Sequence, residues 1–329
     1  MWIVANRTRY ACDGLFLRNT DGAEVWVTVI RGTFNLFPDG HTEIADEQTP
    51  VCKIPEHFGD PAASSLKYDQ DLTLNKPRTD VIVHAQAYAP YGEPSVRVRV
   101  ELELGPIKKA LDVYGDRQWT WESAGRGVSV AEKFTTMPIT WERAYGGADE
   151  SDAKQSWDLR NPIGTGYARQ ATRRIGMPAP NVVTVGGSLT NPSGFGPVAR
   201  HWMPRRSYAG TYDAKWEESR APLLPTDYDA RFEQCAPENQ QAKLRGGERV
   251  RIKNMTPDGL LEFTLPKERF VSRSLFGKQL RSIEHRASLA TVIIEPEEMR
   301  LQMVWQSQLE CHAHAYQLRK TITRTKRYI

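Results

Sequence analysis

The sequence has little cysteine, no long apolar run and almost no net charge. No stretch approaches the roughly 18 apolar residues that cross a bilayer, and no basic segment followed by an apolar one marks a signal peptide at the N-terminus. The four cysteines are scattered without a C-x-x-C pair, which fits free thiols packed as small hydrophobic groups in a reducing compartment. We therefore expect a cytoplasmic protein without membrane contact.

The charge balance argues against a nucleic-acid partner. The chain carries 44 basic and 40 acidic residues, a net charge of +4, which falls short of the clustered basic surface of nucleic-acid binders. Its 329 residues, 40% hydrophobic and 26% charged, are ordinary for a globular protein and sufficient for one large or two ordinary domains.

Motifs for the common chemistries are absent. The sequence contains no G-x-x-x-x-G-K-[ST], G-x-G-x-x-G, G-x-S-x-G or H-E-x-x-H, the usual signals for nucleotide binding, acyl transfer and zinc proteolysis. The most metal-like cluster is Cys311, His312 and His314. In a strand only the two histidines would share a face, whereas a zinc site needs three or four converging ligands. We predict no metal and no cofactor.

Both ends of the chain contain a pattern typical of antiparallel strands. Residues 96–104 alternate apolar and charged side chains at period two, so one face packs on a core and the other meets water. Residues 109–114, after Gly105, are the expected antiparallel partner. The basic tail, residues 320–327, is predicted to be an edge strand protected by its charges. Further strands are predicted at residues 24–34, 81–88, 249–252, 260–265, 290–294 and 300–305.

The middle of the chain has a different composition. Residues 141–247 hold 12 of the 24 glycines and 9 of the 21 prolines, which interrupt regular structure because proline lacks an amide donor and glycine lacks a stiffening side chain. The same stretch is rich in aromatic residues, which disordered linkers lack. We expect an ordered, loop-rich layer whose best helix candidate lies around residues 229–241.

These patterns predict a mainly-β fold, with antiparallel sheets packed as a sandwich-like architecture, a loop layer rich in Gly, Pro and aromatics, and few short helices. The expected regions are an N-terminal antiparallel β region (1–140), a loop-rich insert or face (141–247) and a C-terminal β region (248–329). They form one compact unit or two tightly packed domains.

A carboxylate-based hydrolase acting on a glycan or peptide could recruit acids that lie near aromatics in the loop layer. Such acids beside Gly and Pro more often cap turns, and this interpretation is favoured. His201 has no Ser or Cys elbow, so it is a poor signal for nucleophilic catalysis, while its neighbour Arg200 suits pairing with acidic groups. The hydrolase candidates are Glu142, Asp213, Asp227 and Asp229.

Eight short segments carry a family resemblance: residues 76–81 (KPRTDV), 137–147 (MPITWERAYGG), 161–167 (NPIGTGY), 194–202 (GFGPVARHW), 209–213 (AGTYD), 222–225 (PLLP), 236–241 (APENQQ) and 246–248 (GGE). Taken in order along nearly the whole chain, they resemble the type VI secretion effector adaptors, or chaperones, a family long catalogued as a domain of unknown function and encoded beside spike-protein genes.

The resemblance implies a non-enzymatic protein that binds a secreted effector, a toxin, in the cytosol and helps load it onto the spike protein. It supplies no catalytic residues. The hydrolase remains the alternative, and a structural part of the secretion apparatus is a third possibility. The predicted partner-contact residues, all in the loop layer, are Trp141, Arg143, Tyr145, Arg200, His201, Trp202, Tyr212 and Asp213.

Overall fold

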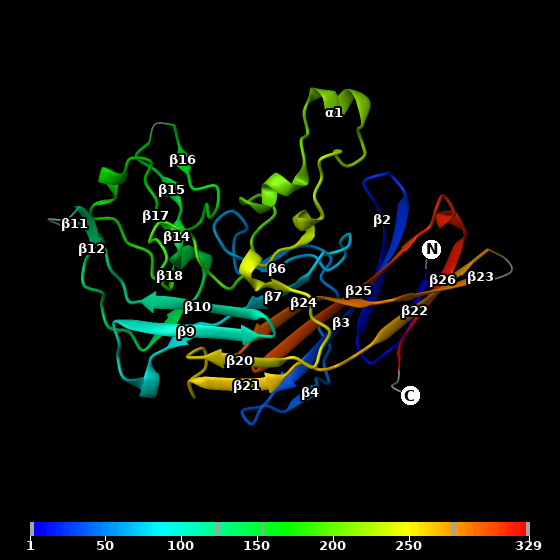
Figure 1. The fold of residues 1–329 in the computed structure, drawn as a ribbon, viewed down its shortest axis with the longest axis horizontal. Helices are drawn as coiled ribbons and strands as arrows, with labels where there is room; N and C mark the ends of the chain where they lie inside the picture. The colour runs from blue at the N-terminus through cyan, green and yellow to red at the C-terminus, as the bar shows by residue number, and fades with distance from the viewer. Residues whose placement is uncertain (1–2, 123–124, 153, 278–280, 327–329) are drawn as a thin grey trace.

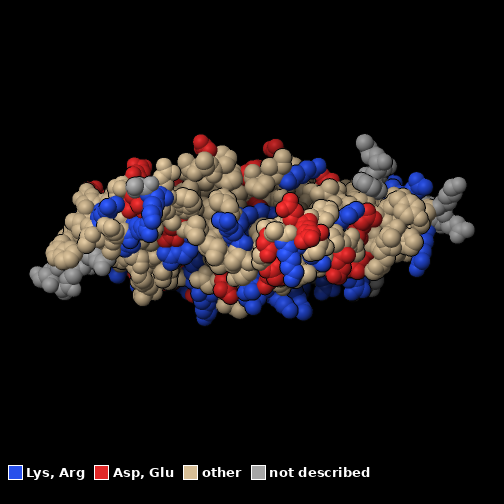
Figure 2. All heavy atoms as spheres, turned by 90° about the horizontal axis from the view of Figure 1, so that it is seen from above, with Lys and Arg blue, Asp and Glu red and all other residues tan. Residues whose placement is uncertain are grey.

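Three sheets form the frame of the molecule, which is elongated and flattened (Figures 1 and 2). The computed structural model describes residues 3–122, 125–152, 154–277 and 281–326. Strands and loops make up nearly all of this part of the chain, so the prediction of a mainly-β fold with several antiparallel sheets is confirmed. On the face presented in Figure 2, acidic and basic side chains are interspersed, as the small net charge suggests.

A seven-stranded sheet crosses the centre of the molecule. Its order is β19-β7-β24-β25-β3-β2, with β4 paired to β3. The pair β7 and β24 is parallel, and the other pairs are antiparallel. Its strands are β2 (Ala11–Arg18), β3 (Glu24–Leu36), β4 (Thr42–Ile44), β7 (Thr79–Val83), β19 (Gln241–Ala242), β24 (Ser288–Glu295) and β25 (Arg300–Glu310).

A five-stranded sheet, ordered β18-β10-β9-β20-β21, lies over part of one face of the seven-stranded sheet (Figure 1). The predicted hairpin is its centre: β9 and β10 pair antiparallel from Leu104 and Ile107 outward. The charged side chains of β9 point to solvent and its apolar ones are buried, as the alternation predicts. The strands are β9 (Arg97–Leu104), β10 (Ile107–Tyr114), β18 (Val182–Thr184), β20 (Arg249–Lys253) and β21 (Leu260–Thr264).

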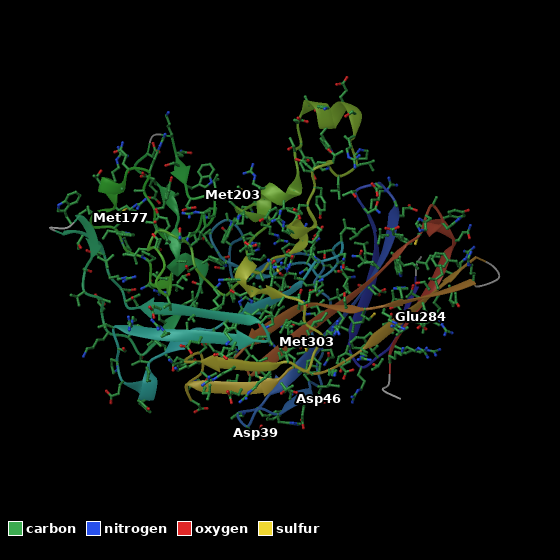
Figure 3. The ribbon with its side chains drawn as sticks, in the orientation of Figure 1. Asp39, Asp46, Met177, Met203, Glu284 and Met303 are labelled. Atoms are coloured by element: carbon green, nitrogen blue, oxygen red, sulfur yellow. The ribbon has the colours of Figure 1, made fainter. Side chains whose placement is uncertain are left out.

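The main core lies between these two sheets. It joins the inward side chains of β9, β10 and β20 to those of β3, β7, β24 and β25, among them Met303, which Figure 3 shows at the centre of the fold. This is a sandwich-like packing of two sheets. Because both sheets take strands from the first and the last third of the chain, each is complete only when distant segments have met.

The other face of the seven-stranded sheet is also covered. Residues 45–76 and parts of the loop layer pack on it, so β3 is buried on both sides for most of its length. This second interface is partly ionic: Arg31 on β3 donates to Asp71 at 2.9 Å and to Gln302 on β25. Paired in this way, the charges can remain inside the protein.

A four-stranded sheet, ordered β1-β26-β22-β23, closes the far end of the molecule. The prediction of an edge strand at residues 320–327 is wrong for the described part: β26 pairs with both β1 and β22. Residue 327 lies outside the described residues. Two threonines of the alternating basic pattern point inward: Thr321 hydrogen-bonds Ser274, and Thr323 hydrogen-bonds Ser272. The strands are β1 (Ile3–Arg7), β22 (Phe270–Phe276), β23 (Arg281–Arg286) and β26 (Leu318–Thr325).

The described residues of the segment 141–247 form an irregular, loop-rich layer, as predicted. The helix expected around residues 229–241 is instead two short 3₁₀ helices, because Pro237 interrupts the segment. The described helices are α1 (Ala214–Ser219) and the 3₁₀ helices η1 (Pro90–Gly92), η2 (Trp141–Arg143), η3 (Ala171–Arg174), η4 (Arg205–Ala209), η5 (Ala230–Glu233), η6 (Glu238–Gln240) and η7 (Ala315–Gln317).

Five small two-stranded sheets complete the fold. They are β5 (Glu56–His57) with β6 (Leu66–Tyr68), β8 (Gln86–Tyr88) with β13 (Thr136–Pro138), β11 (Trp119–Glu122) with β12 (Gly125–Val128), β14 (Tyr145–Gly146) with β17 (Thr165–Gly166), and β15 (Ala148–Asp149) with β16 (Ser156–Trp157).

Candidate functional site

Two tryptophans anchor the loop layer to the core. Trp141 and Trp202 are 5% and 2% exposed, and their rings meet edge to face with centroids 5.8 Å apart. The Trp141 indole donates to the Pro197 carbonyl at 2.9 Å, which satisfies its one polar group. Both were predicted as partner contacts, but in this structure neither side chain lies on the surface.

Tyr145 is also buried, at 2% exposed, where two backbone segments pack closely together. The Asn161 side chain donates to the carbonyls of Trp141 and Tyr145 at 2.8 and 3.0 Å. Gly146 has a φ of 150°, and a Cβ there would lie 2.1 Å from the Asn161 carbonyl oxygen, so only glycine fits. The segments 137–147 and 161–167 therefore have the same structural role, which is to hold each other in place around Tyr145.

Arg200 is partly exposed but already paired within the protein. It contacts Glu233 at 3.1 Å and Asp69 at 3.7 Å, and Arg205 donates to the same Asp69 at 2.5 Å. Burial alone would raise the pKa of Asp69, but the two guanidinium groups outweigh it and lower that pKa. This ion cluster joins the loop layer to the segment that covers the seven-stranded sheet.

The segment Lys76-Pro77-Arg78-Thr79-Asp80 has a similar structural explanation. The Lys76 ammonium pairs with the buried Asp80 carboxylate at 2.9 Å, and Asp80 also accepts the amides of Cys235 and Ala236. Burial disfavours the charged ammonium, but Asp80 outweighs this effect and raises the pKa of Lys76. Asp80 thus connects β7 to the loop layer.

Three other predicted contact residues do lie on the surface: His201, Tyr212 and Asp213. His201 accepts the Trp202 indole N–H at 2.9 Å, and burial together with His57 and Arg206 lowers its pKa. Tyr212 packs edge to face on Trp216, and Asp213 caps α1 by accepting the Trp216 amide at 2.8 Å. Asp213 therefore has the turn-capping role that the sequence favoured.

The other acids of the hydrolase interpretation have local partners too. Asp227 accepts from Thr211, and Asp229 pairs with Arg231 at 2.6 Å. Glu142 accepts from the Ser65 amide and hydroxyl at 2.6 and 2.5 Å. Burial would raise the pKa of Glu142, but these hydrogen bonds lower it, so the carboxylate is held ionised.

Glu142 and Arg143 line an open groove of about 950 Å³, which we call the loop-layer groove. Its walls come from residues 116–118, from residues 129–132 and from the loop around Phe58, and its lining mixes charges with exposed apolar groups. Val130 is 91% exposed and Phe58 is 52% exposed. Arg143 hydrogen-bonds Asn181 at 3.3 Å and lies 3.5 Å from Asp116, which holds its side chain at the groove.

An apolar pocket of about 190 Å³ adjoins this groove, and Phe58, Pro138 and Thr140 line both. Trp141, Ile139 and Leu66 form much of its wall, and Gly194 and Gly196 bring the loop layer against the Trp141 ring. We call it the side pocket. Polar and charged residues, among them His84, Glu297 and Glu298, complete its lining. An open groove beside a small, mostly apolar pocket suits the anchoring of a protein segment through one apolar side chain.

Several groove residues carry no sequence motif and were not predicted: Phe58, Asp116, Glu132 and Val130. They come from segments that are distant along the chain and have no shared motif. The one available signal was an apolar side chain isolated among polar neighbours, as at Phe58, which is too common to single out a site.

Metal binding and membrane insertion gain no support from the part of the chain that the structure describes. No group of three or more His, Cys, Asp or Glu residues there is placed to hold a metal ion. Residues 311–314 follow β25, which ends at Glu310, and His312 and Ala313 have positive φ, so they form a turn rather than a strand. No described helix is long and apolar enough to span a bilayer.

Fold and groove together define a mainly-β protein with an open concavity built on loops. Residues 21–306 match the family described as uncharacterized protein conserved in bacteria (DUF2169). The chain belongs to this bacterial family, whose match includes the groove, the five-stranded sheet and the seven-stranded sheet except for β2 and the last residues of β25. Comparisons with curated proteins and with solved structures gave no match.

Proposed function

We propose that this protein is a non-enzymatic cytoplasmic adaptor that binds a type VI secretion effector and helps load it onto the spike protein. The resemblance of eight segments, in order along nearly the whole chain, to such adaptors suggests the class of partner. The observation that carries the proposal is the loop-layer groove with its apolar side pocket. In this proposal an effector segment lies along the groove and places one apolar side chain in the pocket.

The construction of the groove favours a protein ligand. The loop layer beside its Glu142–Arg143 wall is braced by the Trp141–Trp202 pair, by Asn161 and by the ion cluster around Asp69, so little ordering of that wall is needed when a partner binds. Exposed apolar groups next to partly paired charges resemble the core and rim of a protein interface. His201, Tyr212 and Asp213, which lie on the surface, are proposed as additional contacts.

The direct test is co-expression with the products of neighbouring genes, followed by a tag pull-down and size-exclusion chromatography. The proposal expects a stable complex with one toxin-like partner. The substitution Val130→Glu, on a side chain 91% exposed, should abolish that complex without affecting folding. Leu15→Glu, on an exposed side chain of β2 at the other end of the molecule (Figure 1), is the matched control and should leave it intact.

A complex that survives Val130→Glu, Phe58→Ala and Arg143→Glu alike would contradict the groove as the binding site. A chain that captures no neighbour would contradict the adaptor itself. Of the acids named for the hydrolase alternative, Glu142 lines the loop-layer groove, where Asp116 and Glu132 also lie. That alternative predicts turnover of a glycan or peptide that Glu142→Gln abolishes in the folded protein.

A further inference from the structure

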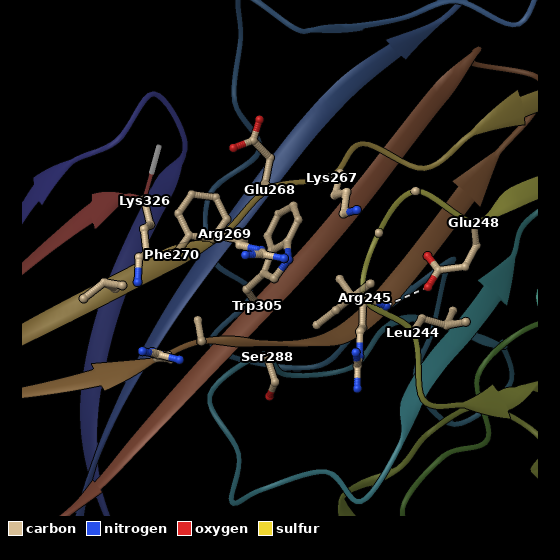
Figure 4. A pocket seen from close by; sticks show the side chains of 16 residues that line it. Leu244, Arg245, Glu248, Lys267, Glu268, Arg269, Phe270, Ser288, Trp305 and Lys326 are labelled. Atoms are coloured by element: carbon tan, nitrogen blue, oxygen red, sulfur yellow. Dashed lines mark hydrogen bonds between the residues drawn. The ribbon is translucent and has the colours of Figure 1, made fainter. Parts of the chain in front are cut away.

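A second concavity lies where the three large sheets meet. It has a volume of about 680 Å³ and lies between residues 244–248, residues 267–271 and residues 286–289 (Figure 4). We call it the junction groove. Trp305, Phe270 and Leu289 give it an apolar lining. Five cations and two acids also line it: Arg245, Lys267, Arg269, Arg286 and Lys326, against Glu248 and Glu268.

The outer face of the four-stranded sheet continues the positive charge of this groove. Strand register places Arg7 beside Arg324, Arg324 beside Val271, and Val271 beside Arg286. Side chains at paired positions project from the same face, so three arginines form one row across four strands. Arg273 lies two residues from Val271 and Lys320 lies four residues from Arg324, so both side chains project from the same face. We call these five residues the basic face: Arg7, Arg273, Arg286, Lys320 and Arg324.

Among the described residues, one acidic side chain lies close to the arginines of the basic face. Glu284 on β23, labelled in Figure 3, lies 3.8 Å from Arg324 and 3.9 Å from Arg273. Like charges on neighbouring strands oppose folding, and Arg7 and Arg324 are direct neighbours in the parallel pair. The inner face of the same sheet is lined by hydroxyl groups of Ser and Thr. The protein thus retains a concentration of exposed positive charge that its own fold does not require.

We propose that the basic face and the junction groove bind an acidic, extended segment of a partner protein. The row from Arg7 to Arg286 spans three strand spacings, about 14 Å at ~4.8 Å each. An extended chain rises ~3.4 Å per residue, so acidic residues at positions i, i+2 and i+4 also span about 14 Å. Three alternating carboxylates therefore match the arginine row in overall length, with Val271 at the third strand position of the row. The junction groove, which shares Arg286, receives the apolar side chains that flank them.

The charge pattern favours a polypeptide over a nucleic acid. Glu284 lies within the basic face, and Glu248 and Glu268 line the groove. A nucleic acid carries a negative phosphate at every nucleotide, so it would meet these carboxylates at several points. A polypeptide combines charged and apolar groups and fits both the mixed charge and the apolar lining. The inference does not depend on the proposed function, because this surface shares no lining residue with the loop-layer groove.

The test is fluorescence anisotropy with a labelled peptide that contains Glu-Val-Glu-Val-Glu. Its controls are the same peptide with Gln in place of Glu, and a single-stranded oligonucleotide. We expect the acidic peptide to bind most tightly and to weaken as salt rises. Arg286→Gln with Arg324→Gln should weaken it about tenfold or more. Arg97→Gln with Arg206→Gln, two exposed arginines elsewhere, should change it less than about twofold.

Tighter binding of the oligonucleotide, equal binding of the Gln peptide, or equal losses in both double variants would overturn the proposal. Circular dichroism establishes that each variant is folded before it is titrated. If the double variant does not fold, Lys320→Gln alone serves in its place, because this half-buried side chain carries its charge on the same face. Retention of full affinity in that folded variant and in Arg7→Gln would also overturn the proposal.

Discussion

Acid should destabilise this protein through His285. Its ring lies between the four-stranded and seven-stranded sheets, 8% exposed, with Nε2 3.0 Å from the Ser274 hydroxyl and Nδ1 3.0 Å from the Ser307 hydroxyl. Burial lowers its pKa to about 4, although Glu284 slightly opposes the effect. In the unfolded chain a histidine has a pKa of about 6.5. Between these values the unfolded state binds the extra proton, so the free energy of unfolding falls as pH falls.

The two pKa values give the magnitude. The contribution of His285 is complete above pH ~7, and about 1.4 kcal/mol of it is lost by pH 5.5 and about 2.5 kcal/mol by pH 4.5. Urea unfolding of the wild type and of His285→Gln, measured across this range, should therefore converge by these amounts. His41→Gln, at an exposed histidine paired with Glu43, is the control and should follow the wild type. Parallel pH profiles for wild type and His285→Gln would refute the reasoning.

Three further predictions concern the core and the loop layer. Trp202→Ala should lower the free energy of unfolding by about 3–5 kcal/mol, measured by chemical denaturation, whereas Trp157→Ala, at a side chain 50% exposed, should cost far less. Asp80→Asn leaves the buried Lys76 ammonium without its carboxylate and should cost about 3–5 kcal/mol; a loss as small as that of Asp39→Asn at an exposed turn would contradict this. Burial lowers the pKa of Lys109 to about 7, where it hydrogen-bonds Gly194 and Gln240, so the unfolded state binds the extra proton above pH 7. Stability should then rise with pH by up to ~1.4 kcal/mol per pH unit from pH 7.5 to 9, and Lys109→Gln should remove that rise.

Local pattern was a good guide wherever one face of a strand meets water. The hairpin of β9 and β10 and the pair β20 and β21 were predicted closely because period-two alternation needs only near neighbours in sequence. The tail at β26 was assigned wrongly to an edge. Its alternation of bases with threonine does show two different faces, but a strand's neighbours are chosen by chain segments far away, here β1 and β22.

The predicted contact residues show the same difference between what local sequence can and cannot predict. Composition marked residues 141–247 as ordered loops, but it could not distinguish an aromatic ring that braces those loops from one that meets a partner. Trp141, Tyr145 and Trp202 brace the layer, while Tyr212 lies on the surface. Burial depends on which segments fold over a residue, and this information is not local.

The sequence by itself therefore determined the mainly-β class, the positions of the amphipathic strands and the irregular but ordered middle. It did so because these features follow from backbone conformation and from the alternation of side chains along a strand. Only the tertiary structure decided which strands share a sheet, which charges are buried as pairs and where the two grooves lie. Each groove is assembled from segments that are distant along the chain, and their approach is fixed by packing of the whole core rather than by any short stretch of residues.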